Sequence, residues 1–116
     1  MQVRRLHHVS VTVDDLDGAL DFYVGKLGAT VRVDRPDLGF RGAWLDLGEG
    51  QLHLIEGVTG TPDGAHFALE VDDLDAAIGA LRARGTTISD PVAIGSARQA
   101  FCEDPSGNRV ELHQVR

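Results

Sequence analysis

The spacing of apolar and polar residues predicts a strand and then a helix near the start of the chain. Valines at every second position of 9–13 alternate with polar residues, which is the period of a half-buried strand. Aspartates within 14–17 supply capping oxygens and favourable negative charge for a helix start. Apolar residues recur at helical spacing over 16–27, and Gly28 follows as a C-cap that ends the helix.

The rest of the chain gives one α+β domain over residues 1–116, made of two modules that each read βαβββ. The first module, 1–57, and the second, 65–116, are joined by a glycine-rich linker at 58–64, a composition typical of a loop. The other expected elements are strands near 29–34, 42–47 and 50–56, a strand at 65–72, a helix at 73–84, and strands near 86–94, 98–103 and 108–114.

The two modules repeat each other at an offset of 58 residues. Val-Asp-Asp-Leu-Asp at 13–17 reappears at 71–75. At the same offset, His8 matches His66 and His53 matches Glu111. The imidazole of histidine and the carboxylate of glutamate are side-chain groups that bind divalent metals. The repeat therefore predicts one metal site built from both modules.

Strand alternation predicts the direction in which these four side chains point. In the strand at 65–72, Phe67, Leu69 and Val71 form the core face, which leaves His66 on the opposite face. His8, His53 and Glu111 are flanked by apolar residues in the same way. All four candidates are therefore expected on the side of the sheets that the helices do not cover. For His53, the alternatives to metal ligation are a contact that orients a ligand and a general base.

Three more ionisable residues lie close to the candidate ligands in the sequence. By the same register His7 falls on the core face, and His113 could line the pocket beyond Glu111. Glu70 lies on the same strand face as His66, which makes it a candidate for moving a proton.

Composition and charge exclude some kinds of partner. The net charge is −7, whereas nucleic-acid binding needs clustered Lys and Arg. No segment approaches the ~20 apolar residues that span a bilayer. The single cysteine, Cys102, cannot form an intrachain disulfide, and its apolar surroundings favour a small core residue over a nucleophile. We therefore expect a soluble cytoplasmic protein that binds neither nucleic acid nor membrane.

The sequence resembles the vicinal oxygen chelate superfamily, which includes glyoxalases, bleomycin-resistance proteins and ring-cleaving dioxygenases. The resemblance covers nearly the whole chain and depends on five stretches. They are His8-Val9 leading into 13–16, Phe22-Tyr23, His66 leading into 71–74, Arg-Gln-Ala-Phe at 98–101, and Asp-Pro-Ser-Gly-Asn-Arg-Val-Glu-Leu at 104–112.

The resemblance implies a glyoxalase-like fold in which eight strands form an open cup around a divalent metal ion. The ligands would come from the first and last strands of each module, here His8, His53, His66 and Glu111. Open coordination positions would let two oxygens of a substrate chelate the ion, which would stabilise an enolate or similar oxyanion. Ligand type alone does not choose among Zn, Ni, Mn, Co and Fe.

The first functional hypothesis is a metal-dependent lyase or isomerase of the glyoxalase kind, acting on a small oxygenated substrate. Glu111 or Glu70 would move a proton at the substrate. His53 departs from the best-known lyases, which usually carry Glu or Gln at that position. In a ligand set of His8, His66 and Glu111 alone, His53 becomes a candidate acid or base.

Two alternatives remain open from the sequence. One is an Fe or Mn dioxygenase or a fosfomycin-type resistance enzyme, which would use the two-His, one-Glu set. The other is a drug-binding protein of the bleomycin-resistance kind without catalysis, with Trp44, Phe40 and Phe101 as a stacking surface. Core packing is the favoured interpretation of these three aromatic residues. An edge strand in each module favours a homodimer, but whether the site lies within one chain or between two is not determined.

Overall fold

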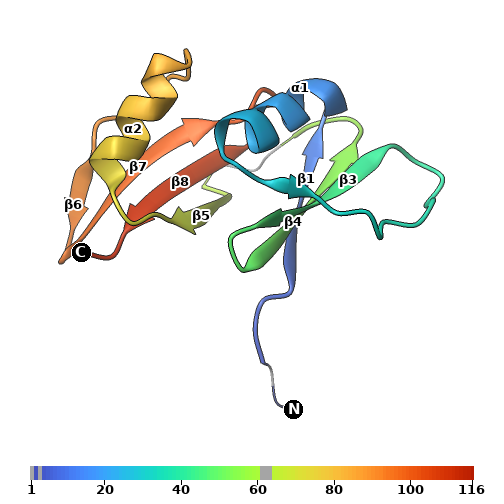
Figure 1. Ribbon diagram of the computed structural model, residues 1–116, viewed down its shortest axis with the longest axis horizontal. Coiled ribbons are helices and arrows are strands. Elements are labelled where there is room, and N and C mark those ends of the chain that lie inside the picture. Colours follow the sequence, from blue (N-terminus) through green and yellow to red (C-terminus); the bar gives the residue numbers. More distant parts are fainter. Residues whose placement is uncertain (1, 3, 61–63) are drawn as a thin grey trace. The chain divides into compact units, whose positions relative to one another are not determined.

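The structure is a computed structural model that describes residues 2, 4–60 and 64–116 (Figure 1). The chain divides into two compact units, residues 1–60 and 61–116, and each is described by itself. Part of the predicted linker, 61–63, lies outside the described residues. No helix within the described ranges is long and apolar enough to cross a membrane.

The first unit is a four-stranded mixed sheet with its helical segment between the first two strands. Its elements are β1 (His8–Val13), α1 (Leu16–Leu20), the π-helical segment η1 (Asp21–Lys26), β2 (Thr30–Val31), β3 (Gly42–Leu47) and β4 (Gly50–Glu56). The strand order is β1-β4-β3-β2. β1 runs parallel to β4, and the other neighbours are antiparallel.

The second unit repeats this arrangement. Its elements are β5 (His66–Glu70), α2 (Leu74–Ala83), β6 (Val92–Ile94), β7 (Ala97–Glu103) and β8 (Arg109–Gln114). The order β5-β8-β7-β6 again places the first strand parallel to the last. The predicted α+β class with two βαβββ modules is therefore confirmed.

Strand register shows that the sequence repeat is a structural repeat. His8 lies opposite Gln51 in the first unit, and His66 lies opposite Arg109 in the second. Both members of each pair are related by the 58-residue offset. The first strand of each unit therefore pairs with the last in the same register. This register follows the 58-residue offset that also relates His8 to His66 and His53 to Glu111.

Both helices begin in the way that the aspartate pattern predicts. Asp15 accepts a hydrogen bond from the Gly18 amide at 3.2 Å, and Asp73 accepts one from the Ala76 amide at 3.0 Å. These carboxylates satisfy backbone donors that have no partner within the helix.

A second capping contact is shared by the two units and was not predicted. Glu56 at the end of β4 accepts from the Leu16 amide at 2.9 Å. Gln114 at the end of β8 accepts from the Leu74 amide at 2.7 Å. Each last strand thereby fixes the start of the helix in its own unit.

The predicted helix over 16–27 is regular only in its first part. From Asp21 it widens into the π-helical segment η1, in which the Leu27 amide donates to the Phe22 carbonyl. The neighbouring residues Phe22 and Tyr23 are both buried. The wider turn is the local arrangement that accompanies the burial of two consecutive aromatic side chains.

Two predicted strands are much shorter than expected. The strand predicted at 86–94 is reduced to β6, with an isolated bridge between Ile88 and Cys102. Pro91 has no backbone N–H to donate to a continuous ladder. The strand predicted at 29–34 is reduced to β2, beyond which Asp34 pairs with the Arg32 side chain rather than continuing the sheet.

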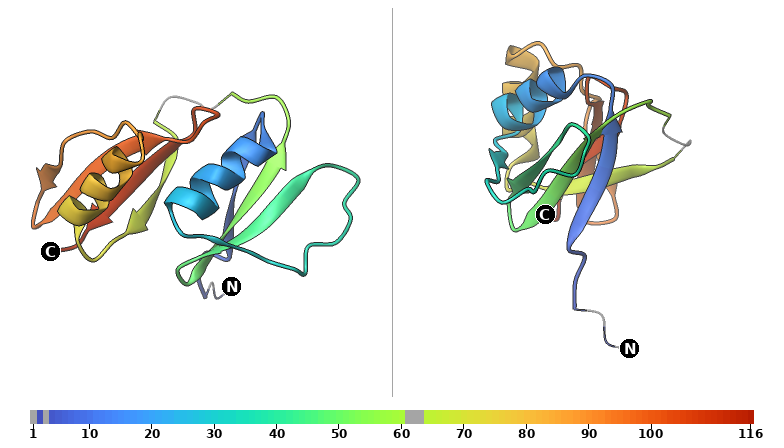
Figure 2. Two further views of the ribbon diagram at one scale, coloured as in Figure 1. Left: turned by 45° about the horizontal axis from the view of Figure 1, so that its top comes forward. Right: turned by 90° about the vertical axis from the view of Figure 1, so that its right-hand side faces the viewer.

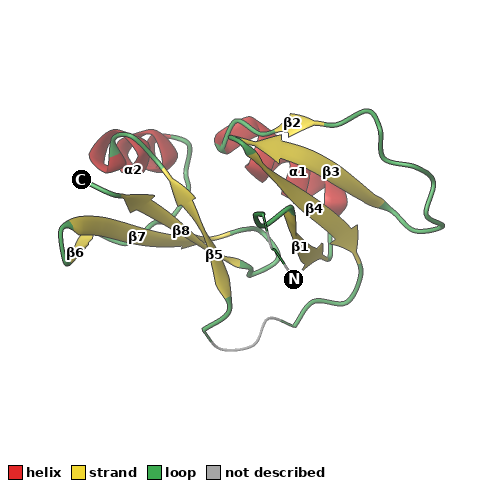
Figure 3. Ribbon diagram, turned by 90° about the horizontal axis from the view of Figure 1, so that it is seen from below, coloured by secondary structure: helices red, strands yellow, loops and turns green. Residues whose placement is uncertain are grey.

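In each unit the helices cover one face of the sheet (Figures 2 and 3). Leu45 and Leu54 belong to the buried apolar face of the first unit, and Val110 and Leu112 to that of the second. Cys102 is buried in the second core, as predicted, and this burial raises the pKa of its thiol. The candidate ligands alternate with these core residues and so occupy the other face.

Candidate functional site

The second unit brings together its two candidate ligands, His66 and Glu111. His66 Nδ1 donates to the Gly64 carbonyl oxygen at 2.9 Å. That bond directs His66 Nε2 toward Glu111, whose Oε1 atom lies 3.1 Å away. Two ligand atoms each about 2.1 Å from one ion at a tetrahedral or right angle are about 3.0–3.4 Å apart. The pair therefore fits as two neighbouring ligands of one metal ion.

Glu111 is held from its other side by His113. The two residues are on the same strand face, and His113 Nδ1 lies 2.8 Å from Glu111 Oε2. Glu111 is 7% exposed, so both oxygens of a buried carboxylate have imidazole partners. The sequence placed His113 only as a pocket-lining residue. Its position two residues from Glu111 on one strand was the signal for this contact, because such side chains share a face.

The first unit brings together His8 and His53. Their rings are stacked, with centroids 3.9 Å apart and planes inclined by 11°. In parallel rings the nitrogen lone pairs lie in parallel planes. Both imidazoles could bind one ion only after one ring turns, so this pair lies close together without the orientation of a chelating pair.

The surroundings of His53 favour its neutral form, which can bind a metal or accept a proton. Burial lowers the pKa of His53, and the positive charges of His8, His7 and two arginines lower it further. Its Nε2 atom is 3.0 Å from Gln51 Oε1, a contact in which the imidazole N–H donates. The neutral ring then has its lone pair on Nδ1, which suits either a ligand or a base.

The three aromatic residues are not core residues, which contradicts the favoured interpretation. Trp44 is half-buried and stacks on His53, with centroids 4.6 Å apart. Phe40 is exposed. Phe101 is half-buried beneath Arg109, whose guanidinium carbon lies 4.1 Å from the ring centroid. Trp44 and Phe101 alternate with the buried positions of β3 and β7, and Phe40 precedes β3. All three therefore lie away from the helix-covered faces.

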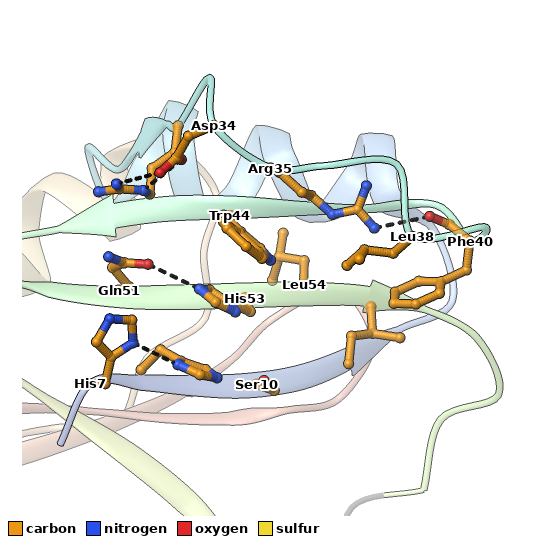
Figure 4. A pocket seen from close by; sticks show the side chains of 13 residues that line it. His7, Ser10, Asp34, Arg35, Leu38, Phe40, Trp44, Gln51, His53 and Leu54 are labelled. Atoms are coloured by element: carbon orange, nitrogen blue, oxygen red, sulfur yellow. Dashed lines mark hydrogen bonds and ion pairs between the residues drawn. The ribbon is translucent and has the colours of Figure 1, made fainter.

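Trp44, His53 and His8 border a pocket of about 510 Å³ in the first unit. Its walls come from β1, β3, β4 and residues 32–40 of the segment between β2 and β3. Figure 4 shows Arg35, Leu38 and Phe40 at one end of this pocket and Gln51 and His7 at the other, with Trp44 and His53 between them. This volume is within the range of small-molecule sites.

The expectation that His7 lies on the core face is wrong. β1 begins at His8, so the alternation that fixes Val9 and later residues does not extend back to His7. Its side chain is exposed, borders the pocket, and has Nδ1 2.9 Å from His8 Nδ1. His7 thus contacts a candidate ligand, which the sequence did not indicate.

Glu70 lies on the exposed face of β5 that also carries His66, in agreement with the alternation. Across the described parts of the chain, no three His, Cys, Asp or Glu side chains form a group that could hold a metal ion. Each unit instead brings one pair of candidate ligands together, His8 with His53 and His66 with Glu111.

Comparison with known proteins gives a consistent set of similarities. Residues 5–112 match the family described as the Glyoxalase/Bleomycin resistance protein/Dioxygenase superfamily. A lactoylglutathione lyase of Haemophilus influenzae is 34% identical over 90% of this chain and 88% of its own length. A chloroplastic relative from Arabidopsis thaliana is 32% identical over 94% of this chain but only 35% of its own length. The chain thus spans about a third of that plant protein.

Among solved structures, TnmS3 is an antibiotic binding protein from Streptomyces sp. CB03234. It superposes on this chain with a TM-score of 0.84 and 30% sequence identity, and the alignment covers 98% of each chain. The same fold is therefore similar both to proteins named as lyases and to one named as a binding protein.

Proposed function

The chain belongs to the Glyoxalase/Bleomycin resistance protein/Dioxygenase superfamily, and from that premise we propose that it is a metal-dependent lyase or isomerase acting on a small oxygenated substrate. His8, His53, His66 and Glu111 are the proposed ligands of one divalent ion, which is Zn, Ni, Mn, Co or Fe. The similarity to a lactoylglutathione lyase over most of both chains supports this reaction type.

One observation carries the proposal, namely the arrangement of His66 and Glu111. The Gly64 carbonyl accepts from His66 Nδ1, which leaves His66 Nε2 facing the carboxylate at 3.1 Å. A hydrogen bond to the second ring nitrogen is the usual way in which proteins orient a histidine ligand. His113 orients Glu111 from the other side. With Nδ1–H donating to the carbonyl oxygen, the neutral imidazole has its lone pair on Nε2, which is the atom that would bind the ion.

The chain's own residues supply binding and proton movement. A bound divalent ion would supply Lewis-acid stabilisation of an enolate or oxyanion. Glu111 or Glu70 would accept a proton from the substrate carbon and return it. If His53 is not a ligand, its neutral imidazole would be the base beside the ion, or its imidazolium the acid. The pocket of the first unit, which His8 and His53 border, would hold the rest of the substrate.

Metal analysis of the protein purified without chelator tests the ligand set. We expect ~1 ion per chain, as for a four-ligand site, and its loss in His66→Ala and Glu111→Gln. His7→Ala is the matched control, because it removes an imidazole beside His8 that is not a proposed ligand, and it should retain the ion. A wild-type protein that contains no metal and also refuses added metal would contradict the proposal.

His53 provides a sharper test of the reaction. Formation of lactoylglutathione should be weak in the wild type and should rise in His53→Glu, which restores the carboxylate usual in the best-known lyases. Equal metal content in the two proteins, measured alongside, separates a change in chemistry from a change in ligation. No activity in either protein, with metal bound in both, would argue for a different substrate of the same site.

A second candidate function is ligand binding without catalysis. The open aromatic surface of Trp44 and Phe40 favours it, as does the similarity to the antibiotic binding protein TnmS3. A binder of this kind would hold its ligand equally well after His66→Ala, whereas a chelated substrate would bind less tightly. Isothermal titration of both proteins with one ligand distinguishes the two functions.

A further inference from the structure

Arg35 is a fixed positive charge at one end of the pocket. Arg35 Nη2 donates to the Phe40 carbonyl oxygen at 2.9 Å, and its guanidinium carbon lies 5.3 Å from the centre of the Phe40 ring. The group also lies against the backbone of Gly42, where an added Cβ would be 3.0 Å from Arg35 Nη2. These contacts hold the guanidinium in place before any ligand arrives.

The charge of Arg35 is not neutralised, unlike that of the neighbouring arginine. Arg32 forms ion pairs at 2.8 Å with both Asp34 and Asp46. Among the residues that the structure describes, Arg35 forms no ion pair with a carboxylate. A guanidinium has five N–H donors in a planar fork that suits a carboxylate. Arg35 therefore retains donors for an anionic group within the pocket.

The wall beside Arg35 is apolar and open. Leu38 and Phe40 are 45% and 47% exposed, and the half-buried Trp44 adjoins them in the pocket (Figure 4). Leucine and phenylalanine are among the residue types most often found buried. Aromatic walls favour a flat ring, which stacks on them at little cost in entropy.

We propose that this pocket binds an aromatic carboxylic acid, with the carboxylate on Arg35 and the ring against Leu38, Phe40 and Trp44. His8 and His53 border the same pocket, so a second oxygen substituent on the ring would face the candidate ligands. The inference names the substrate class of the proposed enzyme and rests on the proposed function for its catalytic meaning. Binding of the acid itself does not require a metal.

Isothermal titration with three probes tests the binding. Naphthalene-2-carboxylate should bind, whereas naphthalene-2-carboxamide lacks the charge and cyclohexanecarboxylate lacks the aromatic ring. A charge-assisted hydrogen bond corresponds to about a 10-fold or larger difference in Kd, so the carboxamide should bind at least that much more weakly. Cyclohexanecarboxylate keeps the charge and should bind more weakly than the naphthalene acid because it has no ring to stack. Equal binding of the acid and the amide, or no binding of the acid, would overturn the proposal.

Variants assign the carboxylate to Arg35. Arg35→Gln should reduce affinity for the acid to that for the amide, and Arg35→Lys should retain part of the preference because the charge remains. Arg84→Gln is the matched control, since it removes the same charge from a residue at the end of α2 that does not line the pocket, and it should bind as the wild type does. Circular dichroism confirms that each variant is folded. Wild-type affinity in Arg35→Gln would overturn the assignment.

The failure of this inference and that of the proposed function can be told apart. Titrations repeated with chelator, and with His66→Ala, should still show binding of naphthalene-2-carboxylate. If metal is bound but the acid is not, the substrate class is wrong and the metal-dependent function stands. If the acid binds but no metal does, the metal-dependent function is wrong and the binding of aromatic acids stands.

Discussion

At the scale of single residues, the contacts of Glu111 orient a buried carboxylate from two sides. His66 Nε2 and His113 Nδ1 lie 3.1 and 2.8 Å from its two oxygens. A buried carboxylate is costly without such partners. The two imidazoles beside the carboxylate also fix the direction of its oxygens, so the geometry of the proposed ligand depends on these three side chains.

Among the glycines, Gly42 leaves the least room for an added Cβ atom. A Cβ at this position would lie 2.4 Å from the Leu54 carbonyl oxygen in the neighbouring strand β4, which forces the strands apart. Gly42→Ala should lower the free energy of unfolding by about 1–3 kcal/mol in urea denaturation. Because Arg35 lies against the same backbone, this variant should also weaken binding of naphthalene-2-carboxylate.

Gly79→Ala is the control for that experiment. Nothing lies within 4 Å of the Cβ that this substitution would add in the middle of α2, so alanine should stabilise the helix by about 0.5–1 kcal/mol. An equal change in the free energy of unfolding for the two substitutions would show that the close approach of Gly42 to the Leu54 carbonyl does not exclude a side chain.

At the scale of elements, each unit connects its last strand to the start of its helix through one side chain. Glu56 does this in the first unit and Gln114 in the second. The last strand also carries a candidate ligand, His53 or Glu111. The capping contact therefore sets the position of the helix against the same strand that presents the ligand.

Removal of the Gln114 side chain should destabilise the second unit. Gln114→Ala leaves the Leu74 amide without its acceptor, and loss of a helix cap corresponds to about 0.5–2 kcal/mol. Gln114→Glu keeps an acceptor and adds a negative charge at the helix N-terminus, so it should be close to wild type. Urea denaturation followed by circular dichroism measures both, and equal loss in the two variants would refute a capping role.

At the scale of the whole molecule, the edge strands lead us to predict a homodimer. On β6, Val92 and Ile94 are 59% and 52% exposed, and an apolar edge strand invites pairing with another chain. Sedimentation equilibrium should show a dimer, and Ile94→Lys should raise its dissociation constant by about 10-fold or more.

Val58→Lys is the matched control, because Val58 is exposed in a loop rather than on a strand edge. It should leave the dimer unchanged. A monomeric wild type, or equal weakening by both substitutions, would contradict pairing through β6.

The repeat and the alternation of the sequence determined the class of fold, the starts of both helices and the face on which each candidate ligand lies. They could do so because the period of a strand and the chemistry of a helix cap are local properties. The chain's membership of its family also followed from motifs spread along the sequence.

Only the tertiary structure decided which side chains meet. The stack of Trp44 on His53, the two imidazoles beside Glu111 and the uncompensated charge of Arg35 join residues from different strands and loops, and no local pattern specifies such distances. His7 was misplaced because alternation stops where the strand does. The strand predicted over 86–94 is too long because Pro91 has no N–H to donate to the ladder.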